Sequence, residues 1–306
     1  MPIKNIVISG GGPSGLISYG AIKKLHQLEV WKQSELSAIY ATSIGGLIGF
    51  LILLDLEWSI IDDYLIERPW VKAFEQVKTD ILEVIYNKGI DGEQMAAIFT
   101  KPLLTSKELP IDITLQQLYD KTNIELCLTA VELNSINGIT TELISYKTYP
   151  NMTLNCALAC TSAVPMIFKP VFYNNKCFID GGMTNNFPLS LCIADTKCKH
   201  SEILAFSNIQ NNNVLKVRET SSIVEYGRII MNKLHCEIET SKNQPVINNI
   251  LYIDLSDVFD ITSWYSVLES GDKRRELIER GETTSATFFK ELNSRQETAE
   301  DCPAEV

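Results

Sequence analysis

The sequence predicts an α/β protein of three layers, in which helices cover both faces of a mostly parallel central sheet. Short apolar runs alternate with longer helical patterns along most of the chain, as expected for parallel strands joined by crossover helices. The chain has 306 residues, 45% of them hydrophobic, and it contains no repeat or low-complexity tract. This length and composition fit one large domain with a sizeable core.

The charge balance of the chain argues against some classes of partner. Lys and Arg number 27 against 38 Asp and Glu, and the net charge of −11 argues against nucleic acid as a partner and against general attraction to anionic membranes. The first residues do not resemble a signal peptide, and the strongest apolar run, Ile44 to Leu54, is too short to cross a bilayer. We therefore expect a soluble, cytoplasmic protein with at most peripheral membrane contact. Eight cysteines without a CxxC pair indicate reduced, mostly buried thiols.

The first expected strand, Ile3 to Ser9, leads into the glycine-rich loop Gly10-Gly11-Gly12-Pro13-Ser14-Gly15 and then into a helix that ends near Leu28. The loop matches the G-x-G-x-x-G fingerprint of dinucleotide-binding proteins, which would make the chain an oxidoreductase. Alternatively, successive glycines leave backbone N–H groups free to converge on an anion and so form an oxyanion hole.

The second expected strand helps to separate these alternatives. A dinucleotide site requires an acidic residue at the end of that strand to hold the ribose hydroxyls. Here the strand, Leu36 to Ala41, ends in Thr42-Ser43, and both Glu29 and Glu35 precede it. The sequence thus favours an oxyanion hole formed by the backbone of Gly10, Gly11 and Gly12, and the oxidoreductase stays as the weaker alternative.

The stretch Ile39 to Leu47 has the pattern of a nucleophile elbow, in which a serine stands on a sharp turn between a strand and a helix. Ser43 is the candidate nucleophile, and the helix N-terminus behind it would favour a developing negative charge. Small residues let the strand and the helix cross closely; here they are Ala41 and Gly45, whereas the usual pattern has glycine at both positions. The alternative is that Thr42-Ser43 merely caps a buried helix.

The helix after Ser43 is apolar on all sides and is expected to end near Asp55. From residue 57 to residue 110, helical patches alternate with prolines and glycines, which predicts a helical insertion. The patches are Ser59 to Leu65, Val71 to Tyr86 and Gly92 to Phe99. Such an insertion suits a cap or substrate groove, with candidate apolar contacts at Trp70, Phe74, Leu103 and Leu104, although ordinary core positions are the commoner explanation for such residues.

The middle of the chain supplies a candidate base. A short helix, two strands joined as a hairpin by Asn-Gly, and a helix of small residues are expected at Leu115 to Asp120, Ile124 to Leu133, Ile139 to Tyr146 and Thr153 to Ala163. A brief strand, Lys176 to Ile179, then ends at Asp180-Gly181-Gly182. The two glycines would let the Asp180 carboxylate approach another loop without a clash, which suits a base facing Ser43, while a plain Asp-Gly turn is the alternative.

Strands and helices continue to alternate towards the carboxyl terminus. The expected elements are a helix to Asp195, a strand from Glu202 to Ser207, a helix from Ser221 to Glu239, a strand from Ile250 to Leu255 and a helix from Lys273 to Leu292. The remaining residues are polar and acidic. We therefore expect one domain over residues 1–293 and a disordered tail over residues 294–306.

Four motifs together resemble the patatin-like phospholipase family in order and approximate spacing: Gly10-Gly11-Gly12-Pro13-Ser14-Gly15, Ala41-Thr42-Ser43-Ile44-Gly45, Ser162-Ala163-Val164-Pro165 and Asp180-Gly181-Gly182. The resemblance extends from Ile3 to Pro188. It implies an α/β/α lipid acyl hydrolase with a Ser–Asp dyad, in which Ser43 is the nucleophile, Asp180 the base and the glycine loop the oxyanion hole. The family often has Lys or Arg in place of Ser14, and usually Gly in place of Ala41, which bears on the rate and on head-group preference.

The implied reaction requires neither a metal nor a cofactor, and the sequence has no pattern that resembles a calcium loop or a His/Cys zinc site. A catalytically weak lipid-binding relative is a further alternative. Because an ordinary Asp is a poor base at a pKa near 3.9, we expect a partly desolvated pocket around Asp180. Met166, Ile167 and Phe168 form the expected contact patch for a phospholipid or other acyl-ester surface. The head group, the acyl position and the oligomeric state stay open.

Overall fold

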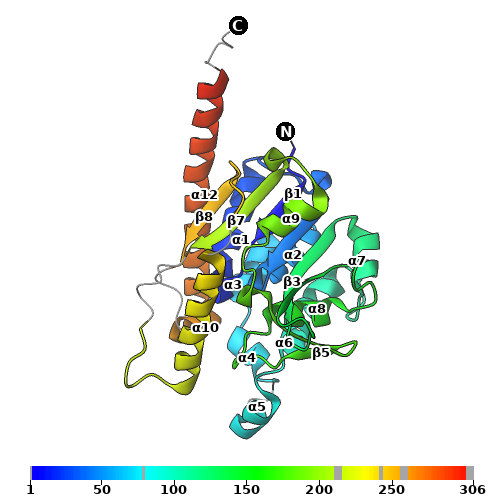
Figure 1. The fold of residues 1–306 in the computed structure, drawn as a ribbon. Coiled ribbons are helices and arrows are strands. Elements are labelled where there is room, and N and C mark those ends of the chain that lie inside the picture. Colours follow the sequence, from blue (N-terminus) through cyan, green and yellow to red (C-terminus); the bar gives the residue numbers. More distant parts are fainter. Residues whose placement is uncertain (1, 78–79, 210–215, 241–243, 256–260, 301–306) are drawn as a thin grey trace.

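The computed structural model describes residues 2–77, 80–209, 216–240, 244–255 and 261–300, and an eight-stranded sheet forms its centre (Figure 1). The strands are β1 Asn5–Ile8, β2 Ala38–Thr42, β3 Glu125–Glu132, β4 Thr140–Ile144, β5 Val171–Tyr173, β6 Lys176–Asp180, β7 Ile203–Ile209 and β8 Ile250–Asp254. Their order is β5-β6-β3-β2-β1-β7-β8, and β4 also pairs with β3. The run from β3 to β8 is parallel, whereas β4 and β6 pair with β3 antiparallel, so the predicted mostly parallel sheet and the β3–β4 hairpin are confirmed.

Helices cover both faces of this sheet. The longer helices are α1 Gly15–Gln27, α2 Ile44–Leu53, α3 Trp58–Glu67, α6 Gly92–Ser106, α8 Leu154–Ser162, α10 Ile223–Thr240, α11 Ile261–Glu269 and α12 Gly271–Glu300. The shorter ones are α4 Trp70–Phe74, α5 Ile81–Asn87, α7 Leu115–Thr122 and α9 Leu189–Thr196, with single 3-10 turns η1 Gly12–Ser14, η2 Gln33–Glu35, η3 Gly181–Met183 and η4 His200–Glu202. None of the helices within the described ranges is both long and apolar enough to cross a bilayer.

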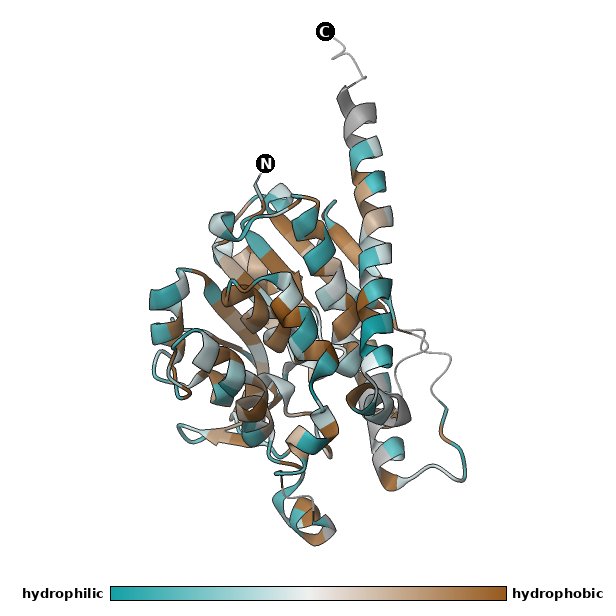
Figure 2. Cartoon of the chain, turned by 180° about the vertical axis from the view of Figure 1, so that it is seen from behind, coloured by the Kyte–Doolittle hydropathy of each residue, from teal (hydrophilic) through white to brown (hydrophobic). Residues whose placement is uncertain are grey.

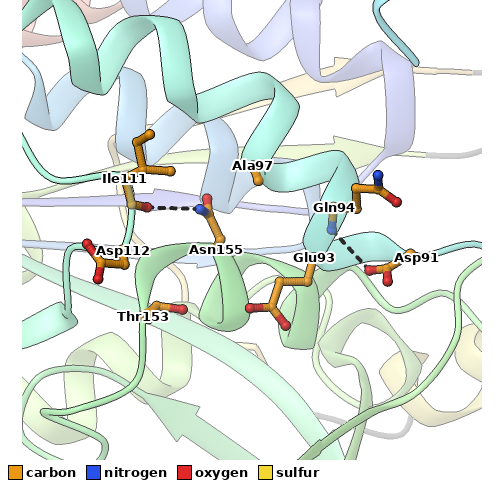
Figure 3. Close-up of a pocket in the computed structure, with 8 residues that line it drawn as sticks. All are labelled: Asp91, Glu93, Gln94, Ala97, Ile111, Asp112, Thr153 and Asn155. Atoms are coloured by element: carbon orange, nitrogen blue, oxygen red, sulfur yellow. Dashed lines mark hydrogen bonds between the residues drawn. The ribbon is translucent and has the colours of Figure 1, made fainter. Parts of the chain in front are cut away.

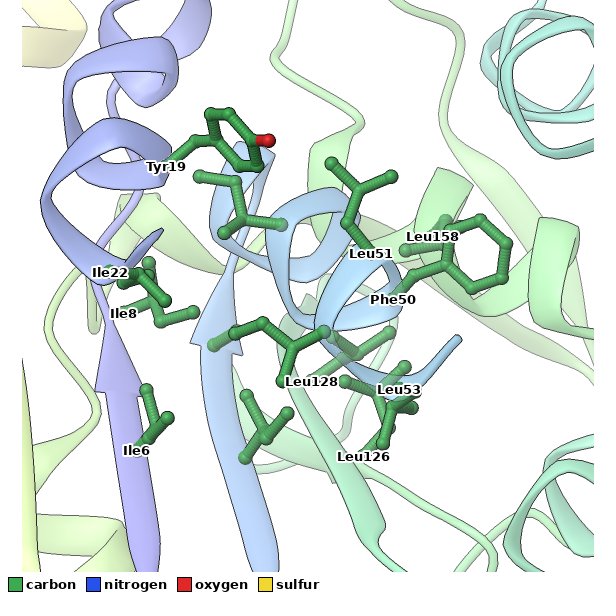
Figure 4. Packing of buried hydrophobic residues seen from close by; sticks show 14 of the residues in the cluster. Ile6, Ile8, Tyr19, Ile22, Phe50, Leu51, Leu53, Leu126, Leu128 and Leu158 are labelled. Carbon is green, nitrogen blue, oxygen red and sulfur yellow. The ribbon is translucent and has the colours of Figure 1, made fainter. Parts of the chain in front are cut away.

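Side chains of the central strands alternate between two cores, one on each face of the sheet. Alternate positions of β1, β2 and β3 pack under α1, α2 and α8 (Figure 4): Ile6, Ile8, Ile39, Ala41, Leu126 and Leu128. The intervening Val7, Tyr40 and Cys127 face a smaller core that includes Leu189 and Cys192 of α9. Burial on both faces explains why these strands are apolar along their whole length.

Helix α12 crosses α1 at close range. A Cβ on Gly20 of α1 would lie 2.1 Å from the Ile278 carbonyl oxygen, and a Cβ on Gly281 of α12 would lie 2.0 Å from the Ile17 carbonyl oxygen. Beside this crossing, the Ser285 hydroxyl donates to the Ala21 carbonyl at 3.0 Å. The last helix is therefore packed into the core of the fold.

The structure corrects the prediction of a single helix from Val71 to Tyr86. Two helices, α4 and α5, occupy this range, and residues 78–79 between them lie outside the described residues. Asp80 begins α5, because its side chain accepts hydrogen bonds from the N–H groups of Leu82 and Glu83. The apolar pattern continues across the break, so periodicity alone suggests one helix.

The structure also corrects the predicted end of the last helix. Helix α12 continues to Glu300 instead of ending near Leu292, while residues 301–306 lie outside the described residues. The domain boundary at residue 293 and the disordered tail stay predictions. Residues 294–300 are rich in Arg, Gln, Glu and Ala, which favour helix even where they are polar. The short elements β5 and α11 were not predicted.

Candidate active site

Ser43 lies directly between β2 and α2 in a strained backbone conformation. Its φ is 54° and its ψ is −126°, outside the regions that residues with a side chain usually adopt. The side chain is almost buried, with 9% of its surface exposed. A strained serine on a strand-to-helix turn has the geometry of a nucleophile elbow.

The two small neighbours of this turn differ in what they require. A Cβ on Gly45 would lie 2.7 Å from the Ile8 carbonyl oxygen, so glycine is needed for α2 to pass β1. Ala41 is fully buried in the main core, which accommodates its methyl group. The departure from glycine at Ala41 therefore does not prevent the sharp turn.

Buried threonines support the backbone around Ser43. The Ser43 N–H donates to Thr161 Oγ1 at 2.9 Å, and the Thr161 hydroxyl donates to the Thr129 carbonyl at 2.5 Å. The Thr42 hydroxyl donates to the Asn185 carbonyl at 3.0 Å. Because the three threonines have no exposed surface, these bonds hold the turn against β3, α8 and the segment before α9 without competition from water.

Strand register brings Asp180 next to Ser43. Thr42 of β2 pairs with Thr129 of β3, and Asp180 of β6 pairs with Ala130, the next residue along β3. Since β4 pairs with β3 across both stretches, β2 and β6 must share the opposite edge of β3. Their carboxyl ends consequently meet end to end, which places the residue after Thr42 beside the Asp180 carboxylate.

The Asp180 carboxylate is buried and hydrogen-bonded. Its Oδ1 accepts from the Gly182 N–H at 2.6 Å. Burial raises the pKa of Asp180 to about 6, while the nearby Ser43 hydroxyl and the Gly182 N–H act in the opposite direction and lower it. A Cβ on Gly181 would lie 2.4 Å from the Thr129 carbonyl oxygen, so the turn approaches β3 only with glycine there. The desolvated pocket expected around this carboxylate is thus present.

The glycine loop lies against the elbow and against the segment after Asp180. A Cβ on Gly10 would lie 3.1 Å from the Ser43 Cβ. The Gly10 N–H donates to the Asn186 carbonyl at 3.2 Å, and the Gly10 carbonyl accepts from Asn186 Nδ2 at 3.2 Å and Asn208 Nδ2 at 2.9 Å. One of the three expected oxyanion donors, the Gly10 N–H, is therefore already engaged.

The N–H groups of Gly11 and Gly12 have no acceptor among the residues that the structure describes. Both peptides are trans, so each N–H points away from the carbonyl of the preceding residue. The two asparagines hold the Gly10 carbonyl, and the Ser14 hydroxyl donates to the Gly11 carbonyl. These side chains therefore fix the directions of the Gly11 and Gly12 N–H groups.

A cavity of about 250 Å³ opens beside Ser43 and is lined almost entirely by apolar side chains. The lining comes from the glycine loop, α1, α2, the helices after α2, and α11, and includes Leu16, Leu47, Trp70, Phe74, Phe99 and Trp264. Trp264 lies against Gly12, where a Cβ would be 2.6 Å from the ring. The size and apolar lining suit a hydrocarbon chain.

The apolar contacts expected in the helical insertion divide between this cavity and the core. Trp70 and Phe74 line the cavity, whereas Leu103 and Leu104 are buried in the main core. The insertion thus contributes directly to the space beside Ser43.

The expected lipid-contact patch is only partly exposed. Met166 has 53% of its surface exposed, while Phe168 lines the cavity. The Ile167 carbonyl accepts from the Ile90 N–H at 2.8 Å, so this segment is tied to the loop after α5. Met166 is the one member of the patch that faces solvent.

A second pocket, of about 360 Å³, is lined mostly by polar and acidic residues (Figure 3), and Ser43 is not among them. Carboxylates of Asp91, Glu93 and Asp112 line it, and none of its lining residues also lines the apolar cavity. Asp91 accepts from the Gln94 N–H at 3.0 Å and pairs with Lys169 Nζ at 2.6 Å. This acidic lining does not suit an acyl chain.

Glu125, Cys127 and Asp195 bring potential metal ligands within 4.8 Å of one another. They lie on the face of the sheet covered by α9, and Glu125 is at the amino end of β3, whereas Ser43 follows the carboxyl end of β2. Lys147 Nζ pairs with Glu125 Oε2 at 2.5 Å. The cluster is therefore remote from the Ser43 site.

Sequence reasoning missed the supporting residues Thr161, Asn186, Asn208 and Trp264. Asn208 lies near the carboxyl end of β7, the edge where ligand sites of parallel sheets gather, and this position is a signal that the sequence does contain. Asn186 stands between the Asp180 turn and α9, where a buried segment needs polar partners. Thr161 and Trp264 carry no comparable local signal.

Comparison with known proteins adds an independent observation. A model of the patatin-like phospholipase family matches residues 6–193. A probable lipid hydrolase of Invertebrate iridescent virus 6 is 28% identical over 196 residues, which cover 62% of this chain and 63% of that protein. An uncharacterized protein of Acanthamoeba polyphaga mimivirus is 24% identical over 223 residues, covering 71% of this chain and 70% of that protein.

Among solved structures, VipD from Legionella pneumophila aligns with 91% of this chain and 67% of its own, with a TM-score of 0.49 and 15% sequence identity.

Proposed function

The chain belongs to the patatin-like phospholipase family, and we propose that it hydrolyses carboxylic ester bonds of phospholipids or acylglycerols through a Ser43–Asp180 dyad. Membership of this family supports lipid hydrolysis in general. One observation carries the proposed mechanism: the strained Ser43 lies beside the buried Asp180 carboxyl, close enough to lower its pKa, at the edge of an apolar cavity.

In the proposed reaction, the Asp180 carboxylate accepts the Ser43 proton as the hydroxyl oxygen attacks the ester carbonyl. The N–H groups of Gly11 and Gly12 would donate to the oxyanion that forms. Protonated Asp180 then returns its proton to the departing alcohol, which leaves an acyl ester on Ser43. A water molecule, deprotonated in turn by Asp180, releases the fatty acid and restores the serine.

The environment of Asp180 supports its role as the base. A carboxylate with a pKa of about 6 is a stronger base than an ordinary Asp and is still ionised at neutral pH. The Gly182 N–H orients the carboxylate. No charged group among the described residues contributes to its pKa shift. The same burial that raises the pKa therefore makes proton transfer from serine more favourable.

The cavity supports a substrate with an acyl chain. We further propose that the insertion at residues 57–110 acts as a cap, because Trp70, Phe74, Met95 and Phe99 from this range line the cavity. Long-chain substrates reside in membranes or lipid droplets, so the protein would bind a lipid surface peripherally and reversibly.

The two other function classes make different predictions for the purified protein. A weak lipid-binding relative would bind lipid without turnover, and a dinucleotide-dependent oxidoreductase would carry bound cofactor. The oxidoreductase has little support, because Thr42 and Ser43 occupy the end of β2 and the turn after it, where an acidic ribose ligand is required.

The proposal is tested by reacting the protein with a fluorophosphonate, which modifies activated serines, and by assaying a chromogenic short-chain ester. We expect hydrolysis of the ester, its inhibition by the reagent, and a single adduct on the peptide that contains Ser43. Absence of both turnover and adduct in the folded protein would leave the lipid-binding relative. An adduct on another serine would refute the assignment of Ser43.

Replacing Gly11 with valine is expected to reduce ester hydrolysis by about 100-fold or more. A side chain here would displace the loop, since even a Cβ would lie 2.6 Å from Asn208 Nδ2, the group that orients the Gly10 carbonyl. The measurement is kcat/KM on the soluble ester, with circular dichroism to check folding. Gly138→Val is the control for backbone strain alone: its φ of 89° disfavours a side chain, but the space around it is open and it is remote from the site, so the folded variant should keep the wild-type rate. Near-normal activity of folded Gly11→Val would remove the loop from the mechanism.

The rate is expected to depend on pH through Asp180. Since burial raises the pKa of this carboxyl to about 6, kcat/KM should be constant above about pH 7 and fall about tenfold for each unit below 6 as the base becomes protonated. The profile is measured on an uncharged ester, and the fold is monitored at each pH. A rate that stays flat down to about pH 4.5 in folded protein would contradict the assignment of Asp180 as the base.

A further inference from the structure

Helix α10 carries an apolar stripe that is exposed to solvent. Its members are Ile223, Tyr226, Ile230, Leu234 and Ile238, with exposed fractions of 75%, 45%, 38%, 54% and 38%. Their spacings of three or four residues place all five on one side of the helix. At 1.5 Å per residue, the stripe from Ile223 to Ile238 extends over about 23 Å of the helix. Contiguous exposed apolar surface of this kind marks an interaction site.

The stripe lies beside the candidate active site. Helix α10 packs against the turn η3, which directly follows Asp180. A Cβ on Gly227, the residue after Tyr226, would lie 2.3 Å from the Sδ of Met166. Exposed Met166 therefore lies against α10, in a segment whose Val164 and Phe168 line the apolar cavity.

A second exposed apolar group lies on α5. Leu82, Ile85 and Tyr86 have exposed fractions of 73%, 70% and 83%. Figures 1 and 2 show α5 and α10 at the same end of the molecule, away from the end where the two chain termini lie. Both exposed apolar groups therefore belong to helices at the same end of the molecule.

We propose that this surface, formed by the α10 stripe, Met166 and the exposed side chains of α5, inserts into the headgroup region of an uncharged or zwitterionic lipid bilayer. The inference rests on the proposed function, because it assigns the surface by which that enzyme reaches its substrate. Lipid drawn out of the bilayer would pass from Met166 to Val164 and Phe168 and so enter the cavity beside Ser43.

The acidic character of the chain favours an uncharged or zwitterionic bilayer over an anionic membrane. The net charge of the chain is −11, and α10 itself carries Arg228 and Lys233 against Glu225, Glu237 and Glu239. An interfacial helix that binds anionic lipids has an excess of basic residues on its polar face. Apolar insertion must therefore supply the binding free energy, and binding should depend only weakly on salt.

The test is sedimentation of the protein with phosphatidylcholine vesicles at low and high salt, with light scattering for the oligomeric state. The double variant Ile223→Glu/Leu234→Glu is expected to bind these vesicles at least about tenfold more weakly, because two exposed apolar side chains become charged. Its hydrolysis of a soluble short-chain ester should stay within twofold of wild type. Val246→Glu is the control. Val246 is 87% exposed and precedes the amino end of β8, whereas Ser43 lies at the carboxyl ends of the parallel strands.

Three results would overturn the proposal. Wild type that fails to sediment, or that binds only anionic vesicles and is released by salt, refutes it. Equal losses of vesicle binding in the α10 variant and in Val246→Glu also refute the proposal. A wild-type dimer that the α10 variant converts to a monomer, with vesicle binding unchanged, would assign the surface to a second copy of the chain. If the α10 variant loses vesicle binding while wild type hydrolyses no ester, the membrane-binding surface is supported and the proposed hydrolase activity is refuted.

Discussion

Replacing Ser43 with alanine is expected to reduce ester hydrolysis by about 10,000-fold or more, the loss typical when a catalytic unit loses its nucleophile. No acyl-enzyme could form, and the oxyanion donors alone would support only residual catalysis. The measurement is kcat/KM on a chromogenic short-chain ester, followed by release of fatty acid from phospholipid vesicles. Because an alanine at this position would keep the same strained backbone, the stability of the variant should be close to that of wild type.

Ser162→Ala is the matched control for this experiment. Ser162 also lines the apolar cavity, and its hydroxyl is buried without a hydrogen-bond partner among the described residues. Its removal should leave the rate within a few-fold of wild type. Comparable losses in the two variants, or a folded Ser43→Ala protein within tenfold of wild type, would show that Ser43 is not the nucleophile.

Asp180→Asn is expected to reduce hydrolysis by about 1,000-fold or more, whereas replacing His26, His200 and His235 together by Gln should leave it within a few-fold. His26 accepts a hydrogen bond from Trp58 Nε1 at 3.0 Å, and His200 lies in η4 before the amino end of β7, on the far edge of the sheet from Ser43. His235 lies in α10, and its side chain is outside the described residues. The measurement is kcat/KM for both variants at about pH 8, where the carboxylate of wild type is ionised.

Stability distinguishes a catalytic loss from unfolding in Asp180→Asn. Burial raises the pKa of Asp180 from 3.8 to about 6, so the ionised carboxylate costs folding free energy above pH 6, and this cost disappears as the pH falls below about 4. Removing the charge should therefore increase the free energy of unfolding at about pH 8 by roughly 2 to 3 kcal/mol, measured by urea denaturation. An active Asp180→Asn protein together with an inactive, folded His200→Gln protein would replace the dyad by a different base.

Local sequence patterns predicted the positions of the main elements because each pattern acts over short distances. The apolar run before Thr42 and the small residues after Ser43 predict the sharp turn, which the structure contains. The Asp180-Gly181-Gly182 motif likewise predicts a turn at the end of a strand, and the structure adds its contact with Ser43. The catalytic roles of both side chains stay predictions until the variants are measured.

Contacts between distant segments could not be predicted in the same way. Asn208 reaches the glycine loop only because β7 pairs with β1, and Trp264 reaches Gly12 only because α11 folds back over the loop. Asn186 similarly engages the Gly10 N–H, which reduces the expected set of oxyanion donors to Gly11 and Gly12. Each of these depends on sheet order, which no local pattern encodes.

Composition was also a weaker guide than helix propensity near the carboxyl end. The polar, acidic character of residues 294–300 suggested that the last helix ends near Leu292, yet α12 continues to Glu300, because a helix can propagate into solvent once its earlier turns are packed. Lys23 and Glu282, paired at 2.5 Å, help to anchor those earlier turns on α1.

The α1–α12 crossing joins the part of the chain that the family model matches to a helix that lies outside it. The family model ends at residue 193, before β7, β8 and α12. Yet Gly20 of α1 and Gly281 of α12 each lie against the backbone of the other helix, and α1 begins where the glycine loop ends. A side chain at either glycine would push apart two helices that lie near opposite ends of the sequence. The part of the chain that the family model matches therefore packs against residues far beyond it, and we expect the two parts to fold as one unit.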